Sequence, residues 1–193
     1  MINFENQEPQ LVNSIKENNI DIPWKHQFEL GDNQYTIPLN KYKNSPANCA
    51  NKWNRIINLI GKDSLNNKKI LDVGCSEGFF AFEAAKYARD VIGVDLDPTR
   101  IERANLIKNF KKNSNCQFIC KDCKDLPEKD FNISLALGLI HRIPDPVGFL
   151  KVLTDLSDEI IVEYKCYRSS KPIAYFAGGK FKINKFSKLY FIF

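Results

Sequence analysis

The sequence predicts an α/β protein with a Rossmann-like, doubly wound and mostly parallel sheet that carries helices on both faces. Three observations support this prediction. From residue 69 onward, short apolar runs alternate with segments of helical periodicity. Two of the helical segments open with an Asp-Pro pair, which suits the cap and the first position of a helix. The chain has 193 residues, 44% hydrophobic and 26% charged, as expected for one domain with a single core.

The expected strands are short apolar runs that follow one another at helix-length intervals. They are Lys69–Val73, Asp90–Val94, Gln117–Cys120, Ile133–Leu137 and Ile160–Val162. Strands that alternate with helices imply right-handed crossovers, so the sheet is expected to be parallel. A ligand is then expected at the carboxyl ends of the strands, beside the point where the strand order reverses.

The expected helices lie between these strands and just before them. Asp97-Pro98 and Asp145-Pro146 each open a helix, and an apolar face predicts a further helix over Phe79–Ala88. Upstream, residues 47–60 read as an amphipathic helix that ends at Gly61. A short helix is expected around Leu11–Lys16, and loops with short strands are expected over residues 24–46.

The chain divides into three expected parts of different charge. Residues 1–64 form an N-terminal extension with a lid helix, residues 65–166 form the Rossmann-like core, and residues 167–193 form a C-terminal segment. Residues 70–166 carry a net charge of −3, whereas residues 167–193 carry +6. The C-terminal segment interleaves basic and aromatic residues. That pattern fits nucleic-acid binding and fits equally a strand with one apolar and one solvated face.

Several classes of protein are excluded by composition. No run of about 18 apolar residues is present, so no membrane span is expected, and no secretory signal is visible, so a cytoplasmic location is expected. The six cysteines are expected to be buried apolar residues rather than disulfides. The single CxxC pair, Cys120 and Cys123, has no second pair, and His26 and His141 are the two histidines, so no metal site is expected.

A glycine-containing loop follows the first strand and leads into a helix. Gly74 and Gly78 allow close approach of a ligand to the backbone, and the free N–H groups of the helix start can bind polar groups. Asp95 ends the next strand, where a carboxylate can accept both hydroxyls of a ribose. Asp122 follows the third strand and could accept a hydrogen bond from an adenine amino group. Three acidic residues at three successive strand ends, counting Asp72, predict a nucleoside cofactor.

Two nucleoside cofactors fit this arrangement, and the loop spacing separates them. A dinucleotide site requires G-x-G-x-x-G and room for a pyrophosphate, whereas this loop is G-x-x-x-G. Asp72 would repel a pyrophosphate but suits a cofactor that bears an ammonium and a sulfonium. The sequence therefore favours S-adenosylmethionine over NAD, and an NAD-dependent oxidoreductase is the disfavoured alternative.

Four segments, in order, resemble motifs of the class I S-adenosylmethionine-dependent methyltransferases. They are Leu71–Gly78, Val91–Asp95, Lys121–Cys123 with Leu126-Pro127, and Leu137–Pro146, and the resemblance covers about residues 65–165. It implies an enzyme that transfers a methyl group to a small molecule or a tRNA nucleoside. It also implies an antiparallel pair of strands after the fifth strand. Only 27 residues remain there, so a complete short chain and a truncated one are both open.

The same resemblance assigns roles to residues around the cofactor. Gly74, Cys75, Ser76 and Gly78 would line the methionine side, and Asp95 would hold the ribose. The remaining assignments are Leu96 under the adenine, Asp122 and Cys123 at the adenine edge, and Leu137 near the cofactor. Asp72 completes the predicted cofactor-binding set.

Function beyond cofactor binding is less constrained by the sequence. Gly78–Ala84, with Trp24, His26 and Glu29–Gly31, resembles the tRNA wobble-uridine methyltransferase-like group, whose members use a derivative of S-adenosylmethionine. His141 lies near a strand end and is the candidate general base, with a structural role in its loop as the alternative. A cofactor-binding protein without catalysis remains a further alternative. The acceptor and the oligomeric state are not predicted.

Overall fold

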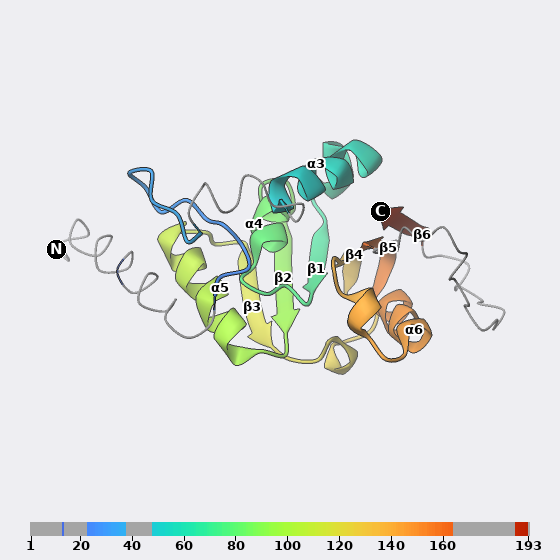
Figure 1. Cartoon of the computed structure of the whole chain (residues 1–193). Coiled ribbons are helices and arrows are strands. Elements are labelled where there is room, and N and C mark those ends of the chain that lie inside the picture. Colours follow the sequence, from blue (N-terminus) through green and yellow to red (C-terminus); the bar gives the residue numbers. More distant parts are fainter. Residues whose placement is uncertain (1–12, 14–22, 38–47, 164–187, 193) are drawn as a thin grey trace, which may run out of the picture.

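The computed structural model describes residues 13, 23–37, 48–163 and 188–192. Within them, a six-stranded sheet has the order β3-β2-β1-β4-β5-β6 (Figure 1). All five pairs of neighbouring strands are parallel, so the Rossmann-like α/β prediction is confirmed. The strands are β1 (Lys69–Val73), β2 (Asp90–Asp95), β3 (Cys116–Cys120), β4 (Phe131–Ala136), β5 (Ser157–Glu163) and β6 (Lys188–Ile192).

In the described part of the chain, four α-helices and three short 3-10 turns connect and cover these strands. They are α3 (Cys49–Ile60), η2 (Lys62–Leu65), α4 (Phe79–Ala85), α5 (Pro98–Phe110), η3 (Cys123–Asp125), η4 (Ile140–Arg142) and α6 (Pro146–Leu156). Both predicted aspartate caps are present, because Asp97 Oδ1 accepts the Thr99 N–H at 2.9 Å and Asp145 Oδ1 accepts the Gly148 N–H at 2.9 Å. The helix predicted over Phe79–Ala88 ends earlier, at Ala85.

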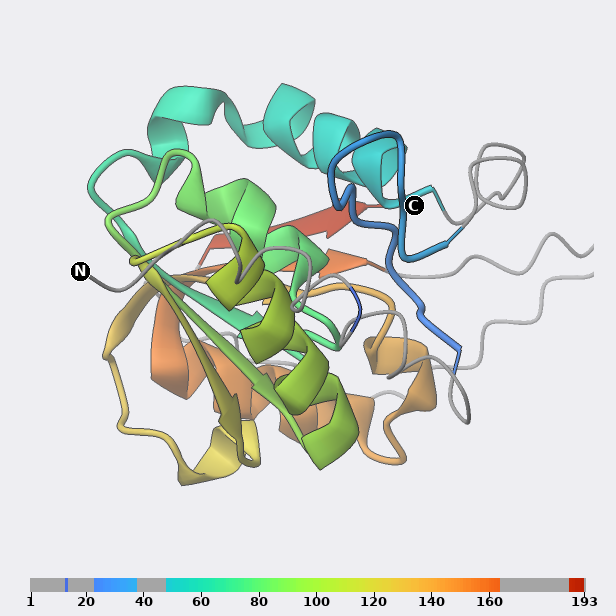
Figure 2. The ribbon, with the colours of Figure 1, turned by 90° about the vertical axis from the view of Figure 1, so that its left-hand side faces the viewer.

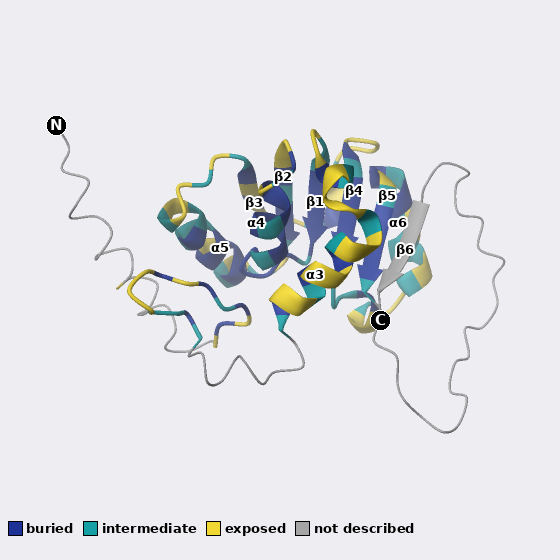
Figure 3. Cartoon of the chain, turned by 90° about the horizontal axis from the view of Figure 1, so that it is seen from above, coloured by how far each residue is buried: buried dark blue, intermediate teal, exposed yellow. Residues whose placement is uncertain are grey.

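The core has two layers because successive strand residues point to opposite faces of the sheet. Ile70 packs into a cluster that includes buried residues of α3, α4 and α5, whereas Leu71 packs into the cluster under α6. Figure 2 shows α6 on the face opposite the other three helices. Figure 3 shows the strands between them as the most deeply buried part of the molecule.

The strand order reverses at the centre of the sheet, between β1 and β4. The chain runs outward from β1 to β2 and β3, then returns to place β4 on the other side of β1. Because all described strands are parallel, the loops after β1, β2, β3 and β4 gather at one edge (Figure 1). This edge is where a ligand is expected in an open α/β sheet.

Residues 23–37, called the N-terminal strap from here on, pack against the helices on the first face. Trp24 and Phe28 join the core cluster, and an isolated antiparallel bridge pairs Glu29 with Tyr35. The predicted loop is confirmed in this part, whereas the predicted short strands are reduced to this single bridge. The helix predicted around Leu11–Lys16 lies outside the described residues, apart from Asn13.

The carboxyl-terminal edge differs from the expectation of an antiparallel pair. Strand β6 pairs in parallel with β5, with Glu159 opposite Lys188 and Glu163 opposite Ile192. Residues 164–187, most of the predicted basic and aromatic segment, lie outside the described residues. None of the helices in the described ranges is long and apolar enough to cross a membrane.

Candidate functional site

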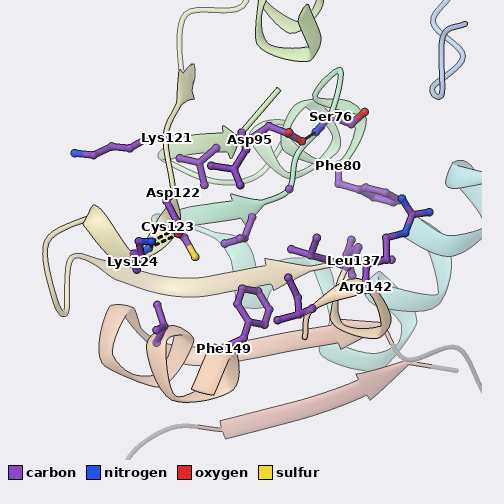
Figure 4. A pocket seen from close by; sticks show the side chains of 18 of the residues that line it. Ser76, Phe80, Asp95, Lys121, Asp122, Cys123, Lys124, Leu137, Arg142 and Phe149 are labelled. Carbon is purple, nitrogen blue, oxygen red and sulfur yellow. Dashed lines mark hydrogen bonds and ion pairs between the residues drawn. The ribbon is translucent and has the colours of Figure 1, made fainter. Parts of the chain in front are cut away.

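A cavity of about 990 Å³ opens at the carboxyl edge of the sheet, next to the point where the strand order reverses. This volume is at the upper end of the range for small-molecule sites, which is about 300–1,000 Å³. The loops after β1, β2, β3 and β4 line it, together with residues of the N-terminal strap, α3 and α6 (Figure 4).

The loop after β1 is held in its shape by the neighbouring strand. The N–H groups of Gly74 and Cys75 both donate to the Val94 carbonyl oxygen, at 2.8 and 3.0 Å. Gly78 has φ +85°, and a Cβ there would lie 2.6 Å from ring carbons of Phe118. A glycine is therefore required at position 78 both for the backbone conformation and for the packing.

Asp95 joins this loop to the end of β2 and faces the cavity. Its Oδ2 accepts the Ser76 N–H at 2.9 Å, and its Oδ1 accepts the Asp97 N–H at 3.0 Å. A carboxylate has about four lone-pair positions, so this group can accept two further hydrogen bonds. Next to it, Leu96 lines the cavity with 70% of its surface exposed, which provides an uncovered apolar surface for a flat ligand.

The loop after β3 supplies a second carboxylate. Asp122 caps η3 by accepting the Lys124 N–H at 3.1 Å, and its other oxygen lies 3.1 Å from Lys124 Nζ. The hydrogen bond from the Lys124 backbone, followed by contacts with the Lys124 side chain, holds the pKa of Asp122 below its usual value. Burial raises the pKa of Cys123 to about 11, so its thiol is neutral and presents an apolar surface to the cavity.

Seven of the predicted cofactor-binding residues meet in this cavity. They are Gly74, Ser76, Asp95, Leu96, Asp122, Cys123 and Leu137. Asp72, Cys75 and Gly78 belong to the same strand and loop but do not line the cavity.

Each of these three residues has a structural position instead. Strand alternation turns Asp72 toward α4, where the Ala81 N–H bonds its carboxyl group and burial raises its pKa to about 7. Its Oδ2 is buried without a hydrogen-bond partner in the described part of the chain. Cys75 is buried, with its Sγ packed against Gly93, and Gly78 is the left-handed residue that opens α4.

The predicted general base also lies elsewhere than expected. His141 is exposed on η4 and does not line the cavity, whereas the next residue, Arg142, does. In this tight turn, a shift of one residue decides which side chain lines the cavity. The histidine that does line the cavity is His26, from the N-terminal strap.

Glu77 attaches the N-terminal strap to the glycine loop and was not singled out from the sequence. Its fully buried carboxylate accepts the backbone N–H groups of Lys25 and His26, at 3.1–3.3 Å, and pairs with Arg100 Nη1. Arg100 also donates to the Pro23 carbonyl oxygen at 3.2 Å. This arrangement places Lys25 and His26 at the cavity. Burial lowers the pKa of His26 to about 4, so its imidazole is neutral near pH 7.

No group of three or more histidine, cysteine, aspartate or glutamate side chains suitable for a metal occurs among the described residues. The CxxC pair has one exposed member, Cys120, contrary to the expectation that the cysteines are buried.

Solved structures share this fold at low sequence identity. Monomeric WbdD superposes with a TM-score of 0.62 at 19% identity, covering 84% of this chain and 40% of that one. The N-terminal domain of EvdMO1, solved in the presence of SAH and D-fucose, superposes with a TM-score of 0.60 at 17% identity, covering 83% of this chain and 64% of that one.

Curated relatives match the core of the chain. A tRNA U34 carboxymethyltransferase from Nautilia profundicola is 31% identical over 105 residues, which are 53% of this chain and 34% of the relative. A ubiquinone biosynthesis O-methyltransferase from Aliivibrio fischeri is 26% identical over 95 residues, 48% of this chain and 41% of the relative. The chain thus spans about half or less of the length of these relatives.

A family model described as a methyltransferase domain matches residues 64–177, more than half of the chain. The match extends over strands β1 to β5, the glycine loop and the cavity-lining loops that follow β1 to β4. The predicted family, with S-adenosylmethionine as its cofactor, is thereby confirmed, and the chain belongs to the methyltransferase-domain family.

Proposed function

We propose that this protein transfers the methyl group of S-adenosylmethionine to an acceptor that binds in the same cavity. The observation that carries the proposal is Asp95, a half-buried carboxylate with free lone pairs that also fixes the glycine loop through Ser76. A ribose with two adjacent hydroxyls suits such an acceptor. The exposed Leu96 beside it offers a surface for the adenine.

The proposed cofactor half uses the seven predicted residues that line the cavity. Asp95 accepts from the ribose, Asp122 and Cys123 contact the adenine edge, and Gly74 and Ser76 border the methionine part. Asp72, Cys75 and Gly78 support this half from beneath by shaping the loop and the start of α4.

When bound, S-adenosylmethionine would supply an electrophilic methyl carbon, with neutral S-adenosylhomocysteine as the leaving group. The protein then has to hold the acceptor in position and exclude water, and such alignment can contribute about 7–11 kcal/mol. His26 replaces His141 as the candidate to contact the acceptor, as a neutral hydrogen-bond partner. Its imidazole lines the cavity, and its Nδ1 lies 3.5 Å from Glu77 Oε2.

The acceptor is proposed to be a small molecule or a tRNA nucleoside. Relatives named for each class match the core of this chain at 25–31% identity. A cytoplasmic location is part of the same proposal, because Cys75, Cys116, Cys120 and Cys123 form no disulfide, as in a reducing compartment.

The test is transfer of tritium from S-[methyl-³H]adenosylmethionine to total tRNA or to a small-molecule extract, with release of S-adenosylhomocysteine measured in parallel. The proposal expects labelled product in one fraction, less with His26→Asn, and no change with His141→Asn. Tight binding of the cofactor without label in either fraction would instead support a cofactor-binding protein without catalysis.

A further inference from the structure

The cavity has two ends of different character. Figure 4 shows Lys121, Asp122 and Lys124 at one end, and Phe80 and Arg142 at the other. The first end contains residues proposed to hold the adenine, so the second end is left for the acceptor. We call this second end, lined by Lys25, His26, Lys52, Phe80 and Arg142, the acceptor end.

Several contacts tie the acceptor end together. Lys52 Nζ lies 5.5 Å from the centroid of the Phe80 ring, and the His26 and Phe80 ring centroids are 5.9 Å apart. Burial is the main cause of the lowered pKa of His26, and the positive charges of Lys52 and Lys25 lower it further, so both charges lie near the imidazole. Arg142 points toward the Phe80 side from the opposite wall (Figure 4). Three cations therefore face one end of one cavity.

Two of these three cations have no counter-ion in the described residues. Lys52 pairs with Glu163 at 2.7 Å. Lys25 and Arg142 are both exposed, and no described carboxylate forms an ion pair with either of them. Glu77, the nearest buried carboxylate, bonds the backbone of Lys25 rather than its ammonium group.

The cofactor would add to the excess of positive charge at the acceptor end rather than neutralise it. S-Adenosylmethionine carries one carboxylate against an ammonium and a sulfonium, so it brings a net positive charge into the cavity. Even if its carboxylate meets one of the free cations, the other remains unbalanced. Lys25 and Arg142 both line this cavity, so an anion that binds at this end is attracted by both positive charges.

We propose that the acceptor carries a carboxylate or phosphate group that binds at Lys25 and Arg142, beside the Phe80 ring. An arginine can bind either anion through two parallel hydrogen bonds, which also fixes the orientation of the acceptor. This inference rests on the proposed function and specifies the substrate class of the same site.

The test uses benzoate and benzamide, a matched pair of which one is anionic and the other neutral, with methyl phosphate as a second anion. Each is titrated calorimetrically into full-length protein saturated with S-adenosylhomocysteine. We expect benzoate to bind about tenfold or more tightly than benzamide. Arg142→Gln and Lys25→Gln should each reduce this preference to about threefold or less. Lys121→Gln removes the same charge at the other end and should leave the preference intact.

The cofactor's own carboxylate is the competing source of the anion, and a second pair of ligands separates the two. S-Adenosylhomocysteine has this carboxylate, whereas 5′-methylthioadenosine does not. The inference is overturned if Arg142→Gln and Lys25→Gln weaken S-adenosylhomocysteine but not 5′-methylthioadenosine and leave the benzoate preference unchanged. Equal binding of benzoate and benzamide to the saturated wild-type protein overturns it as well, with cofactor binding intact. Failure of S-adenosylhomocysteine to bind would instead contradict the proposed function.

Discussion

Replacement of Asp95 by asparagine changes one oxygen of the proposed ribose acceptor into an amide nitrogen. In the native protein, the two oxygens accept N–H groups from Ser76 and Asp97 at 2.9 and 3.0 Å. An amide can accept at one oxygen, so either the loop or the turn after β2 loses its bond, and the ribose loses a charged acceptor. A hydrogen bond to a charged group contributes about 1.5–3 kcal/mol. The dissociation constant for S-adenosylhomocysteine should therefore rise about 10- to 150-fold.

Asp97 offers a matched control two residues away. It caps α5 and does not line the cavity, and asparagine is an equally good cap. Isothermal titration should therefore give Asp97→Asn the wild-type affinity. If Asp95→Asn also binds S-adenosylhomocysteine within about twofold of wild type, which is about 0.4 kcal/mol, Asp95 is not in the cofactor site.

Four further predictions concern the loop, the N-terminal strap and the cavity wall. Gly78→Ala should lower the free energy of unfolding by about 2–5 kcal/mol in urea denaturation, because a Cβ adds left-handed strain and a clash. Leu96→Ala should weaken S-adenosylhomocysteine binding about 5- to 30-fold, without loss of stability. Glu77→Gln should cost about 3–5 kcal/mol of stability, because buried Arg100 loses the closer of its two carboxylate partners and keeps only Asp97, at 3.7 Å. Burial lowers the pKa of His26 to about 4, so between pH 4 and 6.5 the unfolded state binds more protons than the native state. The contribution of His26 to the free energy of unfolding therefore rises with pH in this range. Burial raises the pKa of Asp72 to about 7, so between pH 3.8 and 7 the native state binds more protons than the unfolded state. The contribution of Asp72 to the free energy of unfolding therefore falls with pH in this range. In Asp72→Asn, stability should therefore rise more steeply between pH 4 and 6.5 than in wild type.

Matched variants control the first three of these predictions. Gly31 also has a positive φ, +84°, but a Cβ there would meet nothing within 4 Å. Gly31→Ala should therefore cost only the left-handed strain, about 1–2 kcal/mol of stability. An equal loss of stability in both glycine variants would contradict the clash at Gly78. Leu59→Ala, exposed on α3 outside the cavity, should leave affinity unchanged. Glu83→Gln removes a carboxylate paired with Lys86 near the surface and should cost less than about 1 kcal/mol.

The remaining prediction is controlled by the comparison of pH profiles. A profile of Asp72→Asn that is parallel to that of wild type would show that Asp72 is not protonated in the native state at pH 5–6. A shallower profile would show the same. Either result contradicts the raised pKa.

The fold could be predicted because its signals are local. Each apolar run specifies a strand, and the Asp-Pro pairs at Asp97 and Asp145 specify helix starts. Each signal lies within a few residues of the element that it specifies. Strand ends were less certain, and β4 starts at Phe131 and ends at Ala136 rather than covering Ile133–Leu137.

The site was predicted where parallel topology alone brings residues together, as for Asp95, Leu96 and Asp122 at adjacent strand ends. The prediction was wrong or incomplete where a shift of one residue, or a contact between residues far apart in the sequence, decides which side chain lines the cavity. Asp72 lies in an apolar strand buried on both faces, so its pattern does not show which face it joins.

The contacts made by Glu77 could not be read from the sequence for a different reason. They join residues 51 and 52 positions apart, at His26 and Lys25. They also depend on how the N-terminal strap crosses the helices, which no local pattern specifies. The cations of the acceptor end are therefore a product of tertiary structure, assembled from the strap, α3 and η4.

Thermal unfolding with S-adenosylhomocysteine and with NAD tests the central claim most directly, namely that the cavity beside Asp95 and Leu96 is a site for S-adenosylmethionine. A ligand at 100 times its dissociation constant should stabilise the native protein by about 2.7 kcal/mol. We expect S-adenosylhomocysteine to raise the midpoint of unfolding in wild type and much less in Asp95→Asn, and NAD to have no effect. Stabilisation by NAD alone would contradict this account, and so would an equal response to S-adenosylhomocysteine in both proteins.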